Sequence, residues 1–367
     1  MGALVKYTKQ LLRSPPQLSP EELFVALEGA LAQVVREGTI SLEFGVEFAS
    51  FLTALRASGL DHKAEYIAQA ARAVLQYSDL VADDAVRGGS KERVLDVVGT
   101  GGDGQNTFNV STSAAIVAAG IPGLRVYKHG GKASTSDSGS GDLVRMLGCD
   151  SWKVTSATVP ALCRKNTFLF LLAPNFHEAM RLVAPIRKLL SVPTIFNVLG
   201  PLLHPMGCVN RRVLGVFSEH LGPEYARAAS LMYKDCETFV VWGHVGLDEV
   251  APTGKTTVWH YAAETGSIDT FIIEPAMFGL QEHELSQCAS QGPTENALVL
   301  LDVLSGNRSK GDSIYDYILL NAATLYCLSE GSRDWKHAVA VVEESISSGR
   351  AQKALNEFIS AVDALEV

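Results

Sequence analysis

The sequence predicts an α/β protein, with a mostly parallel central sheet flanked by helices and a smaller all-helical domain at the N-terminus. The chain opens with three stretches of helical periodicity, continues as short apolar runs that alternate with helical stretches, and returns to helices from about residue 293. At 367 residues it exceeds what one hydrophobic core usually serves. We therefore predict a helical domain at residues 1–85, completed by helices around 175–195, and an α/β domain at residues 86–367.

The helical domain is predicted from three segments. Residues 19–37 begin with Ser19 as N-cap and Glu22 completing a capping box, and the run ends at Gly38. Further helical stretches follow at about 41–57 and 61–77. Periodicity alone leaves open whether their apolar faces pack on each other, on the main domain or on a second subunit.

The sheet is predicted from apolar runs that do not alternate with polar residues. Such runs are typical of strands buried on both faces, and the intervening helices imply right-handed parallel crossovers. Residues 256–273 predict additional strands. The main predicted strands are 93–98, 124–128, 167–172, 212–217 and 238–243.

Composition and charge narrow the function. A formal net charge of -9 argues against a general nucleic-acid or anionic-membrane binder, because such partners favour basic surfaces. The six cysteines are scattered without a CxxC pair, which is typical of reduced thiols. The sequence shows no secretory signal and no apolar run long enough to span a bilayer. We expect a cytoplasmic protein that binds neither nucleic acid nor membranes.

A glycine-rich turn follows the first predicted strand, in "GTGGDGQNTFNVST". Glycines allow close approach of the backbone to a ligand, and the N–H groups of the next helix favour an anion. The spacing also satisfies G-x-G-x-x-G, but Asp103 would face a pyrophosphate and the region near 125 is basic where a dinucleotide site needs an acid. A phosphate cradle and a tight turn remain open for the glycines alone.

A second polar loop, "KHGGKASTSDSGSGD" at residues 128–142, follows the next predicted strand. It combines Lys128, His129 and Lys132 with serines and glycines, which suits an anion. Both loops leave the carboxyl ends of parallel strands and should face one crevice. Two anion sites at one edge predict a ligand with phosphates at both ends, whereas a solvated Ser/Gly linker is the alternative.

Five motifs together resemble the anthranilate phosphoribosyltransferases. They are "GTGGDGQNTFNVST", "KHGGKASTSDSGSGD", "FLFLLAPNFHEAMRLVAPIRKLL", "TIFNVLGPLLHP" and "GLDEVAPTG". The resemblance implies transfer of the phosphoribosyl group of phosphoribosyl pyrophosphate to the amine of anthranilate, with release of pyrophosphate, in tryptophan biosynthesis. It also implies that residues 86–367 bind phosphoribosyl pyrophosphate and that the N-terminal helices form a homodimer.

The resemblance also implies the site residues. Those for phosphoribosyl pyrophosphate are Gly99, Gly102, Asp103, Thr107, Asn109, Ser111, Thr112, Lys128 and Ser140. Those for anthranilate are His129, Gly131, Asn175, His177, Arg187, Gly200 and Pro201. Two Mg²⁺ ions are implied, with Ser111, Ser140, Asp248 and Glu249 as ligands. No catalytic nucleophile is expected, because metal ions that stabilise the leaving group and alignment of an unprotonated amine can supply the acceleration.

Some of these roles also have a physical basis in the residues themselves. Asp248 and Glu249 follow a predicted strand, where both carboxylates can turn toward the crevice and bind a hard cation together with substrate phosphate. The planar guanidinium of Arg187 can meet a carboxylate with two hydrogen bonds.

One position departs from the family pattern. Gly131 stands where most members carry Asn, so acceptor contacts there are in question. Two other functions remain as alternatives: a pyrimidine nucleoside phosphorylase of the same fold, and a non-catalytic relative that binds nucleic acid.

Overall fold

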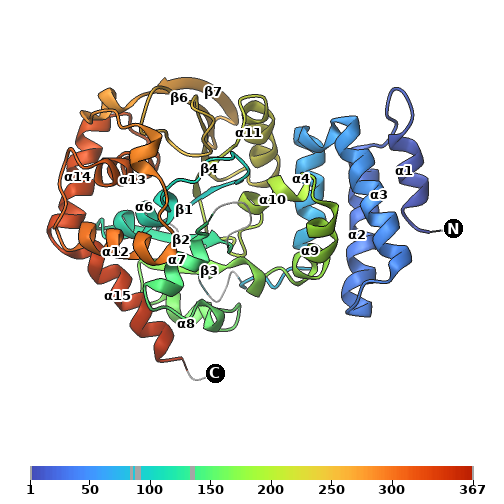
Figure 1. Cartoon of the computed structure of the whole chain (residues 1–367), viewed down its shortest axis with the longest axis horizontal. Helices are drawn as coiled ribbons and strands as arrows, with labels where there is room; N and C mark the ends of the chain where they lie inside the picture. Colours follow the sequence, from blue (N-terminus) through green and yellow to red (C-terminus); the bar gives the residue numbers. More distant parts are fainter. Residues whose placement is uncertain (1, 83–85, 87–91, 133–136, 366–367) are drawn as a thin grey trace.

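The computed structural model describes residues 2–82, 86, 92–132 and 137–365. A large α/β region holds the sheet, and a helical region containing the N-terminus lies beside it (Figure 1). The predicted fold class is confirmed. The predicted boundary between residues 85 and 86 adjoins stretches outside the described residues, so the division into domains stays a prediction.

The sheet has seven strands in the order β3-β2-β1-β4-β5-β6-β7. The first five are parallel, and β6 and β7 continue the sheet in antiparallel fashion. All five strongly apolar runs form strands, as predicted, and residues 256–273 supply the last two. The bounds are β1 Arg93–Gly99, β2 Leu124–Gly130, β3 Phe168–Leu172, β4 Arg211–Gly215, β5 Glu237–Gly243, β6 Thr256–Ala262 and β7 Ser267–Ile273.

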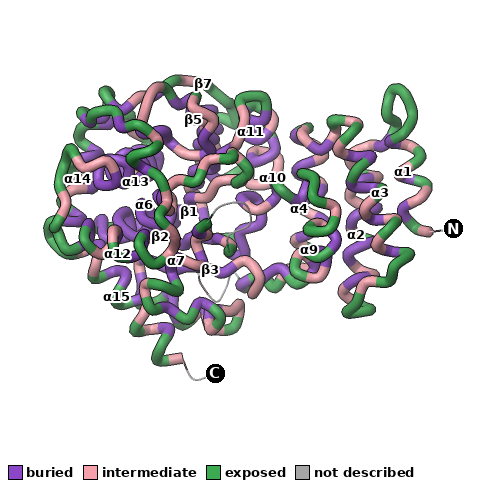
Figure 2. Tube along the Cα trace, viewed as in Figure 1, coloured by how far each residue is buried: buried purple, intermediate pink, exposed green. Residues whose placement is uncertain are grey.

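One face of the sheet is covered by helices from the middle and the end of the chain. Their apolar side chains form one core with β1, β2 and β3, and buried residues follow the sheet and the inner sides of these helices (Figure 2). The helices of this region are α6 Val110–Ala119, α7 Ser140–Met146, α8 Val159–Cys163, α12 Pro293–Leu304, α13 Ser313–Glu330, α14 Trp335–Ser347 and α15 Arg350–Asp363.

The other core belongs to the helical region. Its helices are α1 Val5–Leu11, α2 Pro20–Glu37, α3 Leu42–Ser58, α4 Ala64–Leu75, α9 Glu178–Leu190 and α10 Phe196–Leu199, and α11 Leu221–Met232 joins them to the sheet. Ala179, Val183 and Ile186 of α9 are buried in this core. Ser19 caps α2 with the predicted capping box. The sequence interpretation missed α1, and it began α4 three residues early, because residues Leu60–His62 form a separate 3-10 turn.

No helix in the described part of the chain is long and apolar enough to cross a membrane. All six cysteines are described, and they are free thiols.

Candidate active site

A cavity of about 380 Å³ opens at the carboxyl ends of β1 and β2. This is the edge of a parallel sheet where ligands usually bind. Most predicted site residues line it: Gly99, Gly102, Asp103, Thr107, Asn109, Ser111, Lys128, His129, Gly131, Ser140, Arg187, Gly200, Asp248 and Glu249. Four predicted residues, Thr112, Asn175, His177 and Pro201, do not.

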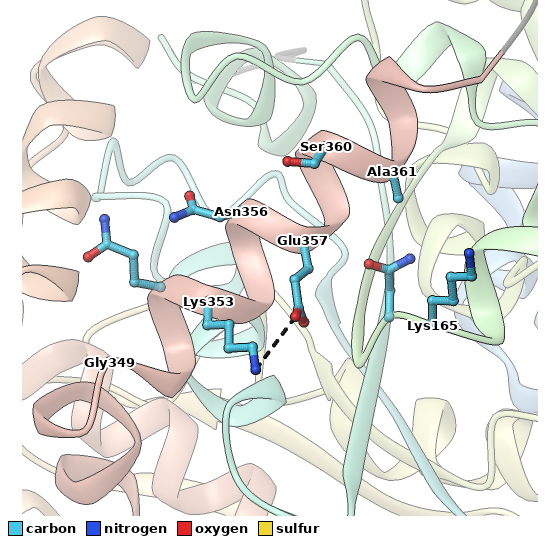
Figure 3. A pocket seen from close by; sticks show the side chains of 9 residues that line it. Lys165, Gly349, Lys353, Asn356, Glu357, Ser360 and Ala361 are labelled. Carbon is cyan, nitrogen blue, oxygen red and sulfur yellow. Dashed lines mark ion pairs between the residues drawn. The ribbon is translucent and has the colours of Figure 1, made fainter.

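A larger cavity, of about 690 Å³, lies elsewhere (Figure 3). Lys165 and Asn166, which precede β3, face residues of α15 there, and a Lys353–Glu357 ion pair of 3.7 Å lies along its wall. It therefore adjoins the amino end of a strand, away from the predicted loops.

The glycine-rich turn adopts backbone conformations that favour glycine. Gly101, Gly102 and Gly104 have φ angles of 68°, 79° and 74°. Asp103 Oδ1 accepts a hydrogen bond from the N–H of Gln105 at 3.1 Å, which closes the turn. The chain then enters α6, with Asn109 at the N-cap. The turn thus delivers backbone N–H groups and a helix N-terminus to the cavity, an arrangement that suits phosphate.

The two polar loops lie side by side. Asn109 Nδ2 donates to the carbonyl of Ser138 at 2.8 Å, and the hydroxyl of Ser138 donates back to Asn109 Oδ1 at 2.7 Å. Asn106 makes a second such pair with Asp137. The predicted juxtaposition of the loops at one sheet edge is therefore observed. Residues 133–136, which include Ser134, Thr135 and Ser136 of the second polar loop, lie outside the described residues.

The paired carboxylates border the same cavity. Asp248 Oδ2 accepts from the N–H of Gly101 at 2.6 Å, and Glu249 accepts from the hydroxyl of Tyr317. Burial is the main cause that raises the pKa of Asp248, and the negative charge of Asp103 is the second. Burial and the negative charge of Asp248 raise the pKa of Glu249. Carboxylates in this condition fit a divalent cation, because a cation would offset the charge that burial penalises.

The carboxylates do not make a complete metal site by themselves. The described residues hold no group of three or more His, Cys, Asp or Glu side chains that could bind a metal ion. Magnesium commonly binds through one or two carboxylates, with substrate phosphate and water as the other ligands. The donor set therefore fits a magnesium ion that arrives with a phosphorylated substrate.

The side chains of Lys128 and His129 lie on opposite faces of β2. Consecutive strand residues point to opposite faces. The Lys128 ammonium donates to the carbonyl of Val97 and is attracted by Asp96 first and then by Glu249 and Asp248. His129 packs against His177 and His204. Burial lowers the pKa of Lys128 to about 8. The end of β2 thus separates a phosphate side of the cavity from a second side.

Arg187 lines the second side of the cavity. It lies over the ring of Phe196, with 5.5 Å from its guanidinium carbon to the ring centroid, and its Nε is buried without a hydrogen-bond partner. Among the described residues, no carboxylate lies within ion-pair distance of it. Burial lowers the pKa of Arg187. A half-buried cation without a counterion among the described residues favours an anionic ligand group, such as a carboxylate.

The comparisons with known proteins agree with this geometry. Residues 91–352 match the model of a family described as "Glycosyl transferase family, a/b domain". The anthranilate phosphoribosyltransferase of Saccharomyces cerevisiae is 58% identical over 377 residues, covering 99% of each chain, and that of Schizosaccharomyces pombe is 41% identical over 313 residues, covering 85% of this chain and 86% of its own. The chain belongs to the anthranilate phosphoribosyltransferase family.

Solved structures give the same result. The S. cerevisiae enzyme in complex with PRPP and Mg superposes with a TM-score of 0.93 at 59% identity, covering 99% of this chain and 98% of its own. The enzyme from Thermus thermophilus superposes with a TM-score of 0.81 at 32% identity, covering 99% of this chain and all of its own.

The four predicted residues outside the cavity have other surroundings. Thr112 is buried within α6, and its hydroxyl has no hydrogen-bond partner among the described residues. Asn175 Nδ2 donates to the carbonyls of Ser151 and Val154, both at 2.9 Å. Pro201 is buried in a 3-10 turn. His177 stands behind His129, with their Nε2 atoms 3.1 Å apart. The binding roles assigned to these four stay predictions.

The structure also reveals supporting residues that sequence reasoning missed. Asn296 Nδ2 donates to Asn109 Oδ1 at 2.9 Å, so the side chain of Asn109 is occupied in joining the loops to α12. Gly215 lies against the backbone of Asp248, and Tyr317 bonds Glu249. A helical Tyr and a strand Gly have no local signal that distinguishes them from ordinary core residues.

Gly131 leads to a prediction about the family's usual Asn. A Cβ at this position would meet no atom within 4 Å, and Gly131 does not have a positive φ. Gly131→Asn should therefore fold normally and lower the KM for anthranilate by about two- to fivefold through one added hydrogen bond, leaving the KM for phosphoribosyl pyrophosphate unchanged. Gly131→Ala is the control. A rise in both KM values would contradict this expectation.

Proposed function

We propose that this chain transfers the phosphoribosyl group of phosphoribosyl pyrophosphate to the amine of anthranilate, giving N-(5-phosphoribosyl)anthranilate and pyrophosphate, in tryptophan biosynthesis. The observation that carries the proposal is a single cavity with two unlike sides. One side has two anion-suited loops and paired carboxylates, and the other has an arginine that pairs with no carboxylate in the described part of the chain. The S. cerevisiae relative has been solved with PRPP and Mg, and also with 4-fluoroanthranilate.

On the phosphate side, the proposal assigns phosphoribosyl pyrophosphate to the glycine-rich turn, the start of α6 and Lys128. Two Mg²⁺ ions, with Ser111, Ser140, Asp248 and Glu249 as protein ligands, would neutralise the charge that develops on the leaving pyrophosphate. Lys128 adds a positive charge on the same side. No general base is required, because an aromatic amine is unprotonated at neutral pH.

On the acceptor side, Arg187 holds the anthranilate carboxylate and so directs the amine toward the ribose. Positioning of this kind can supply a large part of the acceleration, because it removes the entropy cost of bringing two substrates together. The proposal further includes a homodimer formed through the N-terminal helices, supported by exposed apolar side chains at Leu12, Val25, Leu42 and Val46. Cytoplasmic localisation stays a prediction.

The direct test follows anthranilate fluorescence after mixing the protein with anthranilate, phosphoribosyl pyrophosphate and Mg²⁺. We expect a magnesium-dependent loss of fluorescence. Absence of that loss, together with phosphate-dependent cleavage of a pyrimidine nucleoside, would replace the proposal with the phosphorylase alternative. Sedimentation of the same preparation tests the dimer.

Arg187 provides a more specific prediction. Arg187→Gln should raise the KM for anthranilate roughly 10- to 100-fold, because a charged hydrogen bond to the carboxylate is lost, and it should leave the KM for phosphoribosyl pyrophosphate unchanged. The matched control is Lys188→Gln, which removes an exposed cation from the next position of α9. Equal effects of the two variants would exclude the assigned role.

A further inference from the structure

A chain of hydrogen bonds enters the acceptor side from the helical region. Ser78 follows α4, and its Oγ lies 2.8 Å from Nδ1 of His177. Nε2 of His177 lies 3.1 Å from Nε2 of His129, which lines the cavity. Both rings are buried, and neither Ser78 nor the order of these contacts could be read from a local motif.

The position of each proton follows from the partners. The hydroxyl of Ser78 lies 2.9 Å from the carbonyl oxygen of Val74, which can only accept, and we assign its one proton to that carbonyl. With this assignment Oγ accepts from His177, and Nδ1 of His177 carries a hydrogen. In a neutral ring the other nitrogen is then an acceptor. Nε2 of His129 must accordingly donate, which leaves a lone pair on Nδ1 of His129.

The surroundings keep both rings neutral. Burial lowers the pKa of His177 to about 4, against the opposing effect of the Leu203 carbonyl, and it lowers the pKa of His129 well below its usual range. His177, His204, Lys128 and Arg212 lower the pKa of His129 further. The carboxylate of Asp96 also lies near His129, and its Oδ1 accepts from the backbone N–H at 3.2 Å. His204 does not compete for the chain. Its Nε2 donates to the carbonyl of Tyr127 at 2.7 Å, and its Nδ1 accepts from the N–H of Met206 at 3.2 Å.

Ser78 itself is held in place. The N–H of the next residue, Asp79, donates to the carbonyl of Phe176 at 2.7 Å, and Ser156 Oγ donates to the carboxylate of Asp79 at 2.6 Å. These contacts fix the segment after α4 against the segment that leads into His177 and α9. The hydroxyl of Ser78 is thus kept in register with the imidazole.

We propose that Ser78 is a positioning residue, which acts through His177 to keep the proton of His129 on Nε2 and so makes Nδ1 of His129 an acceptor for the amine of the bound substrate. The inference rests on the proposed function for the identity of that amine. Within the described residues Nδ1 of His129 has no hydrogen-bond partner. An amine N–H can donate to it, whereas a carboxylate cannot, so the contact orients the substrate with its amine toward His129.

The kinetic test compares two ligands and three variants. Ser78→Ala leaves the N–H of His177 without an acceptor, which favours the opposite tautomer in both rings. We expect the KM for anthranilate to rise about tenfold. The inhibition constant of benzoate, which has the carboxylate without the amine, should stay within about twofold of the wild-type value. Ser78→Thr should restore the wild-type KM. The control Ser50→Ala removes an exposed hydroxyl that, like that of Ser78, bonds the carbonyl four residues before it, and it should behave as wild type.

Two results would overturn the inference: equal weakening of anthranilate binding and benzoate binding by Ser78→Ala, which indicates general damage to the site, or no change in either.

A readout without turnover separates this inference from the proposed function. In protein with ¹⁵N-labelled histidine, long-range proton–nitrogen NMR spectra should show a protonated Nδ1 in His177 and a protonated Nε2 in His129, assigned from His177→Asn and His129→Asn. The reverse pattern in wild-type protein refutes the role of Ser78 whether or not anthranilate is a substrate, and failure of turnover with the expected pattern counts against the proposed function alone.

Discussion

Asp248→Asn should reduce the rate of phosphoribosyl transfer by about 10²- to 10³-fold, because the variant loses a negative charge that would hold Mg²⁺ against the leaving pyrophosphate. The loss should be greatest at low Mg²⁺ and only partly relieved at high Mg²⁺. Anthranilate fluorescence measured across a magnesium titration checks this. The amide oxygen of Asn can still accept from the N–H of Gly101, so the turn should keep its shape.

The same variant should melt at a higher temperature in EDTA. Since the pKa of Asp248 is raised to about 7, its ionised form is disfavoured in the folded state. The resulting destabilisation is full above the raised pKa and disappears below the usual value of 3.8, so the gain in melting temperature should be seen at pH 8 and vanish at pH 3.5.

Glu264→Gln removes an exposed acid between β6 and β7 and serves as the control for both measurements. Wild-type rates in Asp248→Asn at limiting Mg²⁺ would remove this carboxylate from the proposed chemistry. A lower melting temperature at pH 8 would show that Asp248 supports the fold instead of straining it.

Gly215→Ala, which adds one methyl group, should disrupt the structure of the site severely. A Cβ on Gly215 would lie 1.5 Å from the carbonyl oxygen of Asp248, and this contact is backbone, which cannot rotate away. The segment carrying Asp248 and Glu249 must therefore shift. We expect a loss of about 1–3 kcal/mol in the free energy of unfolding, as in other overpacked cores, and a fall of at least about 10²-fold in kcat/KM, since a displacement near 1 Å can have that effect.

Gly131→Ala is the matched control, because its added methyl enters open space beside the same cavity. Thermal unfolding followed by circular dichroism, and kcat/KM for phosphoribosyl pyrophosphate, should both separate the two variants. Similar behaviour of the two would mean that the segment tolerates displacement and that its position is not critical.

The sequence alone was sufficient to predict those parts of the fold that have a local sequence signature. Strands buried on both faces read as continuous apolar runs, and Ser19 with Glu22 marks the start of α2 within four residues. The two polar loops were recognisable because each follows a strand, and parallel strands bring their carboxyl ends to one edge. The short helix α1 lacked a capping signal, and the structure shows no side-chain cap there.

Features created by contacts between distant segments could not be predicted. Gly215 ends β4, and the backbone of Asp248, between β5 and β6, leaves no room there for a side chain. The hydroxyl of Tyr317 in α13 donates to Glu249. Asn109 lines the cavity, and its hydrogen bonds with Ser138 and Asn296 come from segments far away in the sequence. Ser78 meets His177 across 99 positions of sequence. In each case the residue type is ordinary, and only the folded arrangement gives it a partner.

Under the proposed function, the alternation of side chains at the end of β2 would set which side chain each substrate meets. Because Lys128 and His129 are consecutive, the pyrophosphate end of one substrate and the amine of the other would contact side chains from opposite faces of one strand. A deletion of one residue within β2 would exchange the two side chains, placing imidazole beside the diphosphate and ammonium beside the aromatic ring. The proposed arrangement of the two substrates would thus depend on the parity of a seven-residue strand.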